Sequence, residues 1–199
     1  MDRVVLRGSA GPTVDLGPAG DLRNPPQAGA GGGRAGGVVT AFAGIDHLGL
    51  SVTDLDVSER FYTRVLGLSR LVDFGEVRVL IDRPSSFTLS LSRHADARPG
   101  PFSELTTGLD HVGLTAGSRE DLVAWEDRFR AAGVPFTPIR DMPFGHHLNF
   151  RDPDGIALEF FVPNDVLTDS LREVRDRDVS QEEIRARVEQ VLAGELAQR

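Results

Sequence analysis

The chain contains neither cysteine nor lysine, and all 22 of its basic residues are arginine. The lack of cysteine excludes disulfides, thiolate nucleophiles, and zinc or iron–sulfur sites with cysteine ligands. The lack of lysine excludes Schiff-base catalysis and the lysine-containing phosphate loop of many nucleotide-binding proteins. Any metal or acid–base chemistry must therefore use the five histidines together with carboxylates.

Basic charge and long apolar runs are also scarce. The 22 basic and 30 acidic residues give a net charge of −8, which argues against nucleic acid as a partner because phosphate binding needs a basic face. No apolar run approaches the roughly 18 residues that a membrane helix needs. The first residues lack the apolar core of a secretion signal. We therefore expect a cytoplasmic protein that binds neither nucleic acid nor membrane.

Large apolar side chains are confined to the middle of the 199 residues. All eleven Phe, the one Trp and the one Tyr lie between Phe42 and Phe161, whereas residues 1–40 hold ten of the 22 Gly and four of the 12 Pro. A segment so poor in large apolar groups does not offset its own ordering entropy. We predict a disordered Gly/Pro-rich leader over 1–40 and a folded domain over 41–164.

The last segment, residues 165–199, is charged and has no aromatic residue, and we predict that it is a helical extension. Ser180 and Glu183 have the spacing of a capping box, and apolar residues from Ile184 to Leu196 then recur on one helical face. An earlier short helix is expected around 166–174. The preferred interpretation is a pair of packing or dimer helices, and the alternative is a lid over a site.

The middle of the chain repeats itself. IDHLGLSV (45–52) is followed later by LDHVGLTA (109–116), and each alternating run predicts a strand with two different faces. His47 and His111 occupy equivalent places in the two runs. They therefore lie on the same face of their respective strands.

Each of these strands is followed by a predicted helix, which begins at Asp54 or Ser118 and ends at Gly67 or Gly133. Three short strands follow each helix, near 70–74, 76–81 and 87–92 in the first half and near 135–140, 145–151 and 156–162 in the second. The pattern predicts an α+β fold of two βαβββ modules, about 43–93 and 107–163.

The last predicted hairpin is specified in detail. The sequence DPDG (152–155) predicts a tight turn, and a one-residue bulge at Gly155 would place Asn149 opposite Glu159. With that register, four apolar side chains share one face: Leu148, Phe150, Leu158 and Phe160. His147, Asn149 and Glu159 share the other face. Without the bulge the apolar set would be split, so the pattern favours the bulge.

The doubled βαβββ unit, the two Asp-His strands and DPDGIALEFF (152–161) resemble the vicinal oxygen chelate superfamily. Its members include glyoxalase I, extradiol dioxygenases, fosfomycin-resistance thiol transferases, methylmalonyl-CoA epimerase and metal-free bleomycin-resistance proteins. The resemblance implies that the paired modules form an open, cupped barrel, the glyoxalase/bleomycin-resistance/dioxygenase fold. It also implies that metal ligands project inward from the first and last strand of each module.

Carried onto this sequence, the resemblance implies His47, His111 and Glu159 as metal ligands. The fourth position falls on Ser90, where glyoxalase-like members usually carry Glu. Two imidazoles and one carboxylate suit one divalent metal ion, namely Fe2+, Mn2+, Ni2+, Co2+ or Zn2+. Such a set leaves coordination places open for two oxygens of a substrate.

Several other residues are weaker candidates. His147 is predicted as a general base or a residue that supports the ligands, and Asn149 stands where dioxygenase-like relatives carry a Tyr that orients substrate. Arg140 and Arg151 are candidates for contact with an anionic substrate. His146 is expected to point away from the cavity and to be structural. An apolar pocket lining is possible for Met142, Phe144, Ala157 and Phe161.

From these residues we expect a divalent-metal-dependent, glyoxalase- or dioxygenase-like enzyme that chelates a small-molecule substrate through adjacent oxygens. Two reaction types remain as alternatives for this enzyme: a glyoxalase-like lyase or isomerase, and a dioxygenase. The alternative is a metal-free, bleomycin-resistance-like protein that binds a drug or metabolite. We also expect a homodimer, in which the modules of one chain form one cavity together or exchange with those of the partner.

Overall fold

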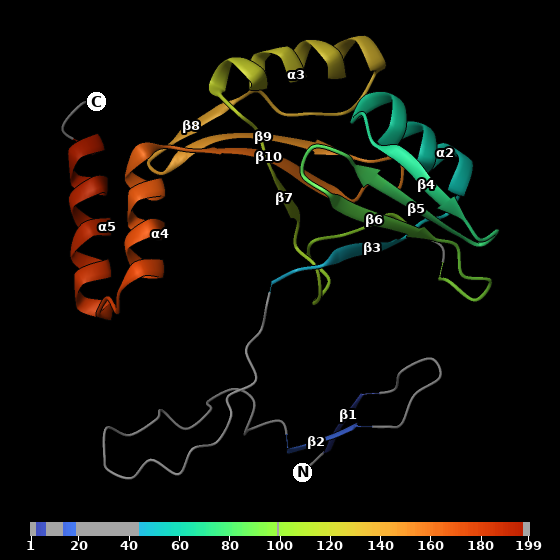
Figure 1. Ribbon diagram of the computed structural model, residues 1–199, viewed down its shortest axis with the longest axis horizontal. Helices are drawn as coiled ribbons and strands as arrows, with labels where there is room; N and C mark the ends of the chain where they lie inside the picture. Colours follow the sequence, from blue (N-terminus) through green and yellow to red (C-terminus); the bar gives the residue numbers. More distant parts are fainter. Residues whose placement is uncertain (1–2, 7–13, 19–43, 99, 197–199) are drawn as a thin grey trace. The chain divides into compact units, whose positions relative to one another are not determined.

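The computed structural model describes residues 3–6, 14–18, 44–98 and 100–196 (Figure 1). Within the predicted leader, β1 (Arg3–Leu6) and β2 (Val14–Pro18) pair antiparallel as a two-stranded sheet. The other residues of that leader lie outside the described residues. The disorder proposed for them stays a prediction.

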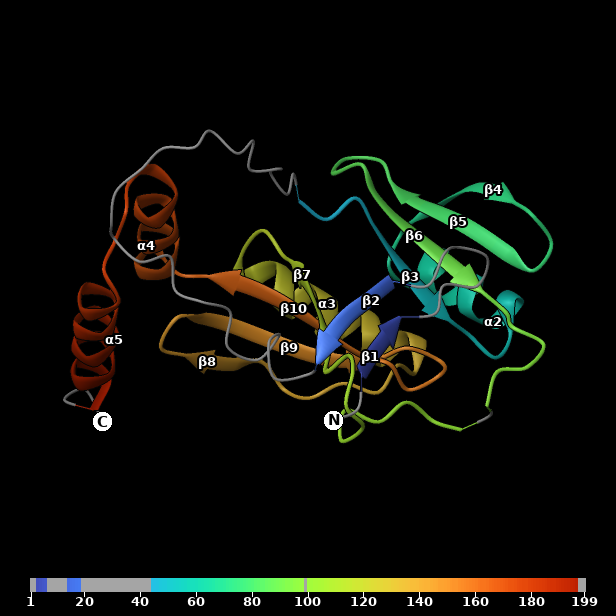
Figure 2. The ribbon, with the colours of Figure 1, turned by 90° about the horizontal axis from the view of Figure 1, so that it is seen from below.

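The rest of the described chain contains two four-stranded mixed sheets, each with the predicted βαβββ order (Figures 1 and 2). The first module comprises β3 (His47–Ser51), α2 (Leu55–Arg60), η1 (Phe61–Val65), β4 (Ser69–Asp73), β5 (Val77–Asp82) and β6 (Phe87–Ser92). The second comprises β7 (Val112–Thr115), α3 (Arg119–Ala132), β8 (Arg140–Met142), β9 (Gly145–Arg151) and β10 (Ala157–Pro163). The sheet orders β3-β6-β5-β4 and β7-β10-β9-β8 are equivalent, and neither sheet closes on itself. The predicted α+β fold of two modules is confirmed.

The first helix begins as predicted but does not continue as a regular α-helix. The Asp54 carboxylate caps α2 by accepting hydrogen bonds from the backbone N–H of Asp56 (2.8 Å) and Val57 (3.0 Å). From Phe61 the helix widens into the π-helix η1, in which the Leu66 N–H donates to the Phe61 carbonyl (3.3 Å). The neighbouring Phe61 and Tyr62 are both buried there, so two consecutive aromatics enter the core.

One predicted strand is displaced. The sequence pattern placed a strand near 135–140, but β8 covers Arg140–Met142, and Phe136 forms only an isolated bridge with Phe150. Pro135 and Pro138 lack a backbone N–H and therefore cannot donate to a ladder in this stretch. Pairing with β9 is therefore limited to this bridge before the second proline, and the ladder of β8 begins after it.

The core lies between the sheets and their helices. Helix α2 contacts β5 and β6, and α3 contacts β9, so each sheet has one covered face (Figure 1). In the second module the rings of Trp125 and Phe160 stack at 4.6 Å, and those of Phe129 and Phe150 are also 4.6 Å apart. The side chains of Leu80, Leu89 and other inward-facing residues fill the equivalent space in the first module. The predicted site residues lie on the opposite sheet faces, away from α2 and α3.

The β9–β10 hairpin has the predicted register. Gly155 has a φ of 78°, its N–H donates to the Asp152 carbonyl (3.0 Å), and the Asp152 N–H donates to the Ile156 carbonyl (3.2 Å). These bonds define a tight turn followed by a one-residue bulge. Asn149 is opposite Glu159 in the ladder, and the four apolar residues predicted to share a face are buried. Both predictions for this hairpin are confirmed.

The same turn joins the two modules. The Asp152 side chain, which is buried at 4% exposure, accepts a hydrogen bond from the Tyr62 hydroxyl of the first module (2.9 Å). The Asp154 carboxylate accepts a hydrogen bond from the Thr53 N–H (3.1 Å) and another from the Thr53 hydroxyl. Two carboxylates of one turn therefore fix the second module against the start and middle of the first helical segment.

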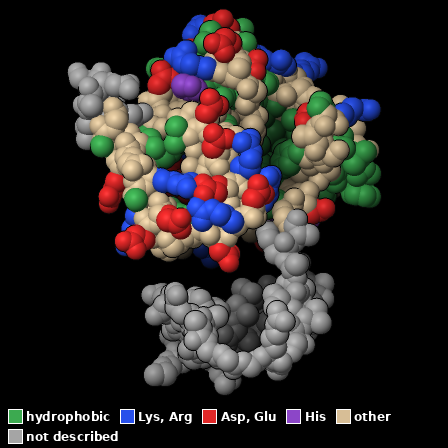
Figure 3. Space-filling view, turned by 60° about the vertical axis from the view of Figure 1, so that its left-hand side comes forward, with side chains coloured by type: hydrophobic (Ala, Val, Ile, Leu, Met, Phe, Trp, Pro, Cys, Tyr) green, Lys and Arg blue, Asp and Glu red, His purple; other side chains and the backbone are tan. Residues whose placement is uncertain are grey.

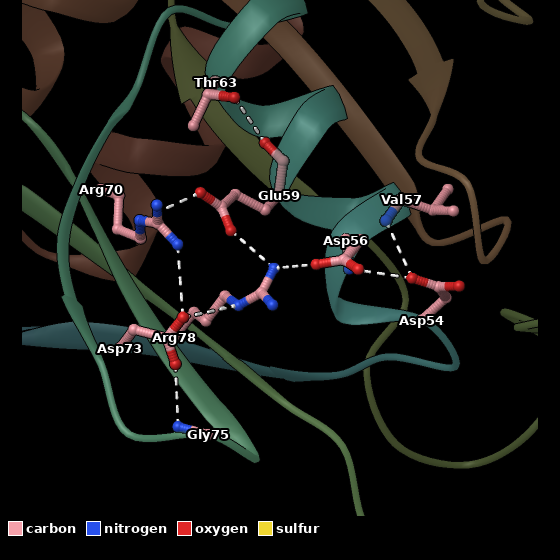
Figure 4. Close-up of polar contacts among 9 residues, drawn as sticks. All are labelled: Asp54, Asp56, Val57, Glu59, Thr63, Arg70, Asp73, Gly75 and Arg78. Carbon is pink, nitrogen blue, oxygen red and sulfur yellow. Dashed lines mark hydrogen bonds and ion pairs between the residues drawn. The ribbon is translucent and has the colours of Figure 1, made fainter.

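An ion-pair cluster joins α2 to the first sheet (Figure 4). Arg78 alternates with Val79, which is paired with Ser90, so the cluster lies on the sheet face opposite to Ser90. The Arg78 guanidinium of β5 lies 2.7 Å from Asp56 and 2.6 Å from Glu59, both on α2, and 3.3 Å from Asp73 of β4. Arg70 lies 3.3 Å from the Glu59 carboxylate. Arg78 and Glu59 are mostly buried, so these pairs are screened by solvent less than surface pairs are.

The C-terminal extension is helical as predicted, with α4 (Asp165–Asp176) and α5 (Gln181–Leu196). The capping box is confirmed: the Glu183 carboxylate accepts from the Ser180 N–H (2.8 Å), and the Ser180 hydroxyl accepts from the Glu183 N–H (3.2 Å). Arg187 of α5 and Arg177 both bind Glu173 of α4 and hold its pKa at about 2. The apolar side chains Val166, Leu171 and Val174 are exposed, and a dimer or lid role for these helices stays a prediction.

No helix within the described ranges is both long enough and apolar enough to cross a membrane. On the face drawn in Figure 3, acidic and basic side chains alternate rather than gather by sign.

The Tyr62–Asp152 contact should be worth a measurable share of stability. Burial raises the pKa of the Asp152 carboxyl, so the folded chain holds this proton more tightly than the unfolded chain does. The Asp152 carboxyl therefore favours folding at low pH, and this contribution to stability is lost as the pH rises through its folded-state pKa.

At pH 7, Tyr62→Phe removes the hydroxyl that donates a hydrogen bond to the buried Asp152 carboxylate. We expect the free energy of unfolding in urea to fall by about 1–3 kcal/mol.

The control for this prediction is the same substitution made in an Asp152→Asn background. The carboxamide carries no charge that needs the hydroxyl, so the effect of Tyr62→Phe should be much smaller there, and the two substitutions should be strongly coupled. Equal losses in both backgrounds would show that the contact does not act through the carboxylate.

Candidate metal and substrate site

The two predicted histidine ligands are held in the same way in the two modules. His47 begins β3 with its side chain 61% exposed, and its Nδ1 lies 2.9 Å from the Asp46 carboxylate. His111 directly precedes β7 with its side chain 48% exposed, and its Nδ1 lies 2.5 Å from the Asp110 carboxylate. In both cases the preceding aspartate contacts Nδ1, and Nε2 has no hydrogen-bond partner within the described residues. Metal-binding histidines are commonly oriented by such a carboxylate.

The predicted carboxylate ligand is oriented by a third histidine. The Oε2 atom of Glu159 lies 2.9 Å from Nδ1 of His147, and the two side chains are 13% and 27% exposed. The His147 ring also lies against Phe161, with ring centroids 4.7 Å apart. The second oxygen of Glu159, Oε1, lies over Gly113 of β7, since a Cβ placed on that glycine would be 3.9 Å from it. One carboxylate oxygen is therefore engaged, and the other is directed over the strand that follows His111.

Ser90 and Glu159 hold equivalent places in the two sheets. Ser90 pairs with Gly49 of β3 as Glu159 pairs with Gly113 of β7. The Ser90 hydroxyl is close enough to Gly49 that a Cβ there would lie 3.1 Å from Oγ. The first module therefore has a short hydroxyl side chain where the second has a carboxylate.

The single chain does not gather the three predicted ligands at one point. Within the parts of the chain that the structure describes, no group of three or more His, Asp or Glu side chains is arranged to hold a metal ion. The structure brings Glu159 to His147 and places Asn149 opposite Glu159. The joint role of His47, His111 and Glu159 stays a prediction.

His146 points away from this face, as expected. Its Nδ1 lies 2.7 Å from Asp141, and the Asp141 carboxylate also accepts hydrogen bonds from Arg119 of α3 (2.9 and 3.1 Å). Arg119, helped by His146, lowers the pKa of the Asp141 carboxyl below its ordinary value. His146 therefore belongs to the contact between the second sheet and its helix.

The two candidate arginines differ in their surroundings. The Arg151 guanidinium lies 2.7 Å from Glu104 and donates a hydrogen bond to the Gly155 carbonyl (3.1 Å), so it supports the hairpin turn and the connection between the modules. Arg140 is paired with His147 in the β8–β9 ladder and is exposed on the same sheet face as His147.

A groove that the sequence did not predict lies at the opposite end of β3. It has a volume of about 590 Å³ and is lined, among others, by Thr53, Arg93, His94, Phe102 and Asp154. Arg93 is already bound by Glu76 through two hydrogen bonds of 2.9 and 2.8 Å. The groove forms because the connection between the modules passes over their junction, and no sequence motif marks it.

Comparison with known proteins agrees with this architecture. Residues 44–160 match the family model described as the Glyoxalase/Bleomycin resistance protein/Dioxygenase superfamily. A probable lactoylglutathione lyase from Vibrio parahaemolyticus is 30% identical over 129 residues, which cover 57% of this chain and 86% of that relative.

Two solved structures show the same fold. A glyoxylase/bleomycin resistance protein/dioxygenase domain from Frankia sp. EAN1pec is 35% identical with a TM-score of 0.59, and the match covers 63% of this chain and 95% of that one. A variant of the fosfomycin resistance protein FosX from Listeria monocytogenes, complexed with Mn(II), is 17% identical with a TM-score of 0.50 and coverages of 64% and 95%. The chain therefore belongs to the glyoxalase/bleomycin resistance protein/dioxygenase superfamily.

Proposed function

We propose that the protein is a divalent-metal-dependent enzyme that chelates a small oxygen-bearing substrate, with His47, His111 and Glu159 as the metal ligands. The observation that carries this proposal is that each of these three side chains is held by a neighbouring side chain. Each imidazole is held at Nδ1 by its neighbouring aspartate, and the carboxylate is held at one oxygen by His147. Three donors are thereby held on the sheet faces that lie away from α2 and α3.

The chemistry of the donors fits the proposed ion. Two imidazoles and one carboxylate suit Fe2+, Mn2+, Ni2+, Co2+ or Zn2+, whereas Ca2+ prefers more oxygen ligands. A bound ion of this class would act as a Lewis acid toward adjacent oxygens of the substrate. The Mn(II) complex of the Listeria protein is consistent with this choice of ion for the fold.

The remaining roles belong to residues of the chain itself. Asp46 and Asp110 hold the two imidazoles in one orientation and one tautomer. His147 is the proposed acid–base group, and since its Nδ1 is engaged by Glu159, its Nε2 is the atom that would exchange a proton with the substrate. Ser90 leaves open the place that a second carboxylate would fill.

We further infer that the site is completed in a homodimer. Beside the two exposed histidines, the apolar side chains of Ile45 and Leu109 are also exposed, Ile45 at 85%. Covering such side chains with a second copy would bury apolar surface and remove water from the ligands. In the exchanged arrangement, His47 of one chain joins His111 and Glu159 of the partner subunit.

Metal titration tests the ligand assignment. We expect the protein, purified without a histidine tag, to bind about one Mn(II) per chain by isothermal titration calorimetry. His47→Ala, His111→Ala and Glu159→Ala should each weaken binding by at least about 100-fold, because each removes a direct ligand. His94→Ala, which lies in the distant groove, is the matched control and should bind normally. If the folded wild-type protein binds no divalent metal, a metal-free drug- or metabolite-binding protein becomes the better reading.

Mixed dimers test the exchange of modules. His47→Ala and Glu159→Ala chains are each expected to bind no metal alone. When the two are refolded together, an exchanged heterodimer contains one intact site, so binding should return to about one metal per four chains. An unexchanged dimer gives no recovery, since every chain then damages its own site. A monomer by light scattering at micromolar concentration would contradict the assembly while leaving the ligand assignment intact.

A further inference from the structure

Arg140 lies on the same face of the second sheet as the proposed metal ligand Glu159. It is paired with His147 in the β8–β9 ladder, and His147 in turn contacts Glu159. The next residue, Asp141, confirms the orientation, because it points to the opposite face and binds Arg119 of α3. Arg140, His147 and Phe161 are therefore paired across three adjacent strands, and Glu159 lies two residues from Phe161 on the same face of β10.

Arg140 also differs from the other arginine of this face in having no acidic partner. The Arg151 side chain is bound by Glu104, whereas the Arg140 guanidinium makes no hydrogen bond or ion pair within the described part of the chain. A guanidinium offers a planar fork of donors that matches a carboxylate, phosphate or phosphonate. On this face Arg140 is the cation available to a ligand, and Arg151 is not.

The spacing of the strands places the Arg140 guanidinium within reach of a ligand that is also held at the proposed metal site. Neighbouring strands lie about 4.8 Å apart, so β8 is separated from β10 by about 10 Å, a distance that a long arginine side chain shortens considerably. The surface between them is formed by the His147 and Phe161 rings, and Met142, 41% exposed, is the next residue of β8 on this face. A ligand that bridges the two positions would have oxygens at one end, an apolar body and an anion at the other.

We propose that Arg140 binds an anionic group of the substrate, a carboxylate or a related oxyanion, while the vicinal oxygens of the same molecule reach the His47, His111 and Glu159 ligands. The substrate is then a small, partly apolar acid rather than a neutral chelator. This inference rests on the proposed function, because it assigns the second contact of a molecule that the metal site holds at its other end.

Two probes that differ in a single carboxylate test the inference. Catechol and 3,4-dihydroxybenzoate present the same pair of oxygens, and only the second carries an anion on the far side of the ring. Binding to the Mn(II)-loaded protein is measured by isothermal titration calorimetry. We expect 3,4-dihydroxybenzoate to bind at least about tenfold more tightly, and Arg140→Gln to weaken it by about 10- to 100-fold while catechol changes by less than about twofold.

Two further variants separate charge recognition from general damage. Arg140→Lys keeps the charge without the planar fork and should recover part of the affinity. Arg83→Gln, an exposed arginine in the β5–β6 turn, is the matched control and should change neither affinity. Equal affinities for the two probes, or an equal loss of both in Arg140→Gln, would overturn the role of Arg140.

The failure of this inference is distinguishable from failure of the proposed function. If Mn(II) binds but neither probe binds at millimolar concentration, the substrate class is wrong and the metal assignment survives. If Mn(II) itself does not bind to the folded protein, the proposed function fails and the assignment of Arg140 fails with it.

Discussion

The turn from Asp152 to Gly155 determines where the chemistry of the second module lies. Gly155 adopts a positive φ, which a residue with a side chain tolerates poorly, and the resulting bulge sets the register of β9 against β10. Side chains alternate between sheet faces, so a slip of one residue would bury Glu159 among the aromatics and expose Leu158. The Asp152 and Asp154 carboxylates of the same turn bind the first module. One short segment thus orients Glu159 and positions the module opposite it.

The parts of the fold that the sequence predicted correctly are those specified by local chemistry. The caps at Asp54 and Ser118, the turn at Gly155 and the alternation along β9 and β10 each depend on residues close together in the chain. The π-helix at Phe61 and the contact of Tyr62 with Asp152 depend on what lies across the core. No local pattern encodes such contacts, which is why the first helix was predicted as regular.

For the candidate site, the sequence predicted which residues face the open sides of the sheets but not how these sides come together. The repeat placed His47 and His111 at equivalent positions, and the hairpin register placed Glu159 beside His147 on an open sheet face. Neither the sequence nor a single chain determines how the two open faces meet. That depends on surface buried between modules or between subunits, which is a property of the assembly rather than of any one motif.

The open faces of the two sheets differ in the side chains that they carry. The open face of the first sheet carries His47 followed by small or aliphatic residues, including Ser90 and Val79, which are paired across β5 and β6. The open face of the second sheet carries Glu159, His147 and Arg140. Under the proposed function, polar groups along the second sheet would set the direction of a bound molecule, since its anion and its pair of chelating oxygens would be bound at different points. Under the proposed function, the first sheet would contribute one metal ligand, His47. Because Ser90 stands where the second sheet has Glu159, the acidic and basic side chains Glu159, His147 and Arg140 all lie on the second sheet. Under the proposed function, a substrate would then have one orientation in which its anionic group meets Arg140 and its vicinal oxygens meet the metal ligands.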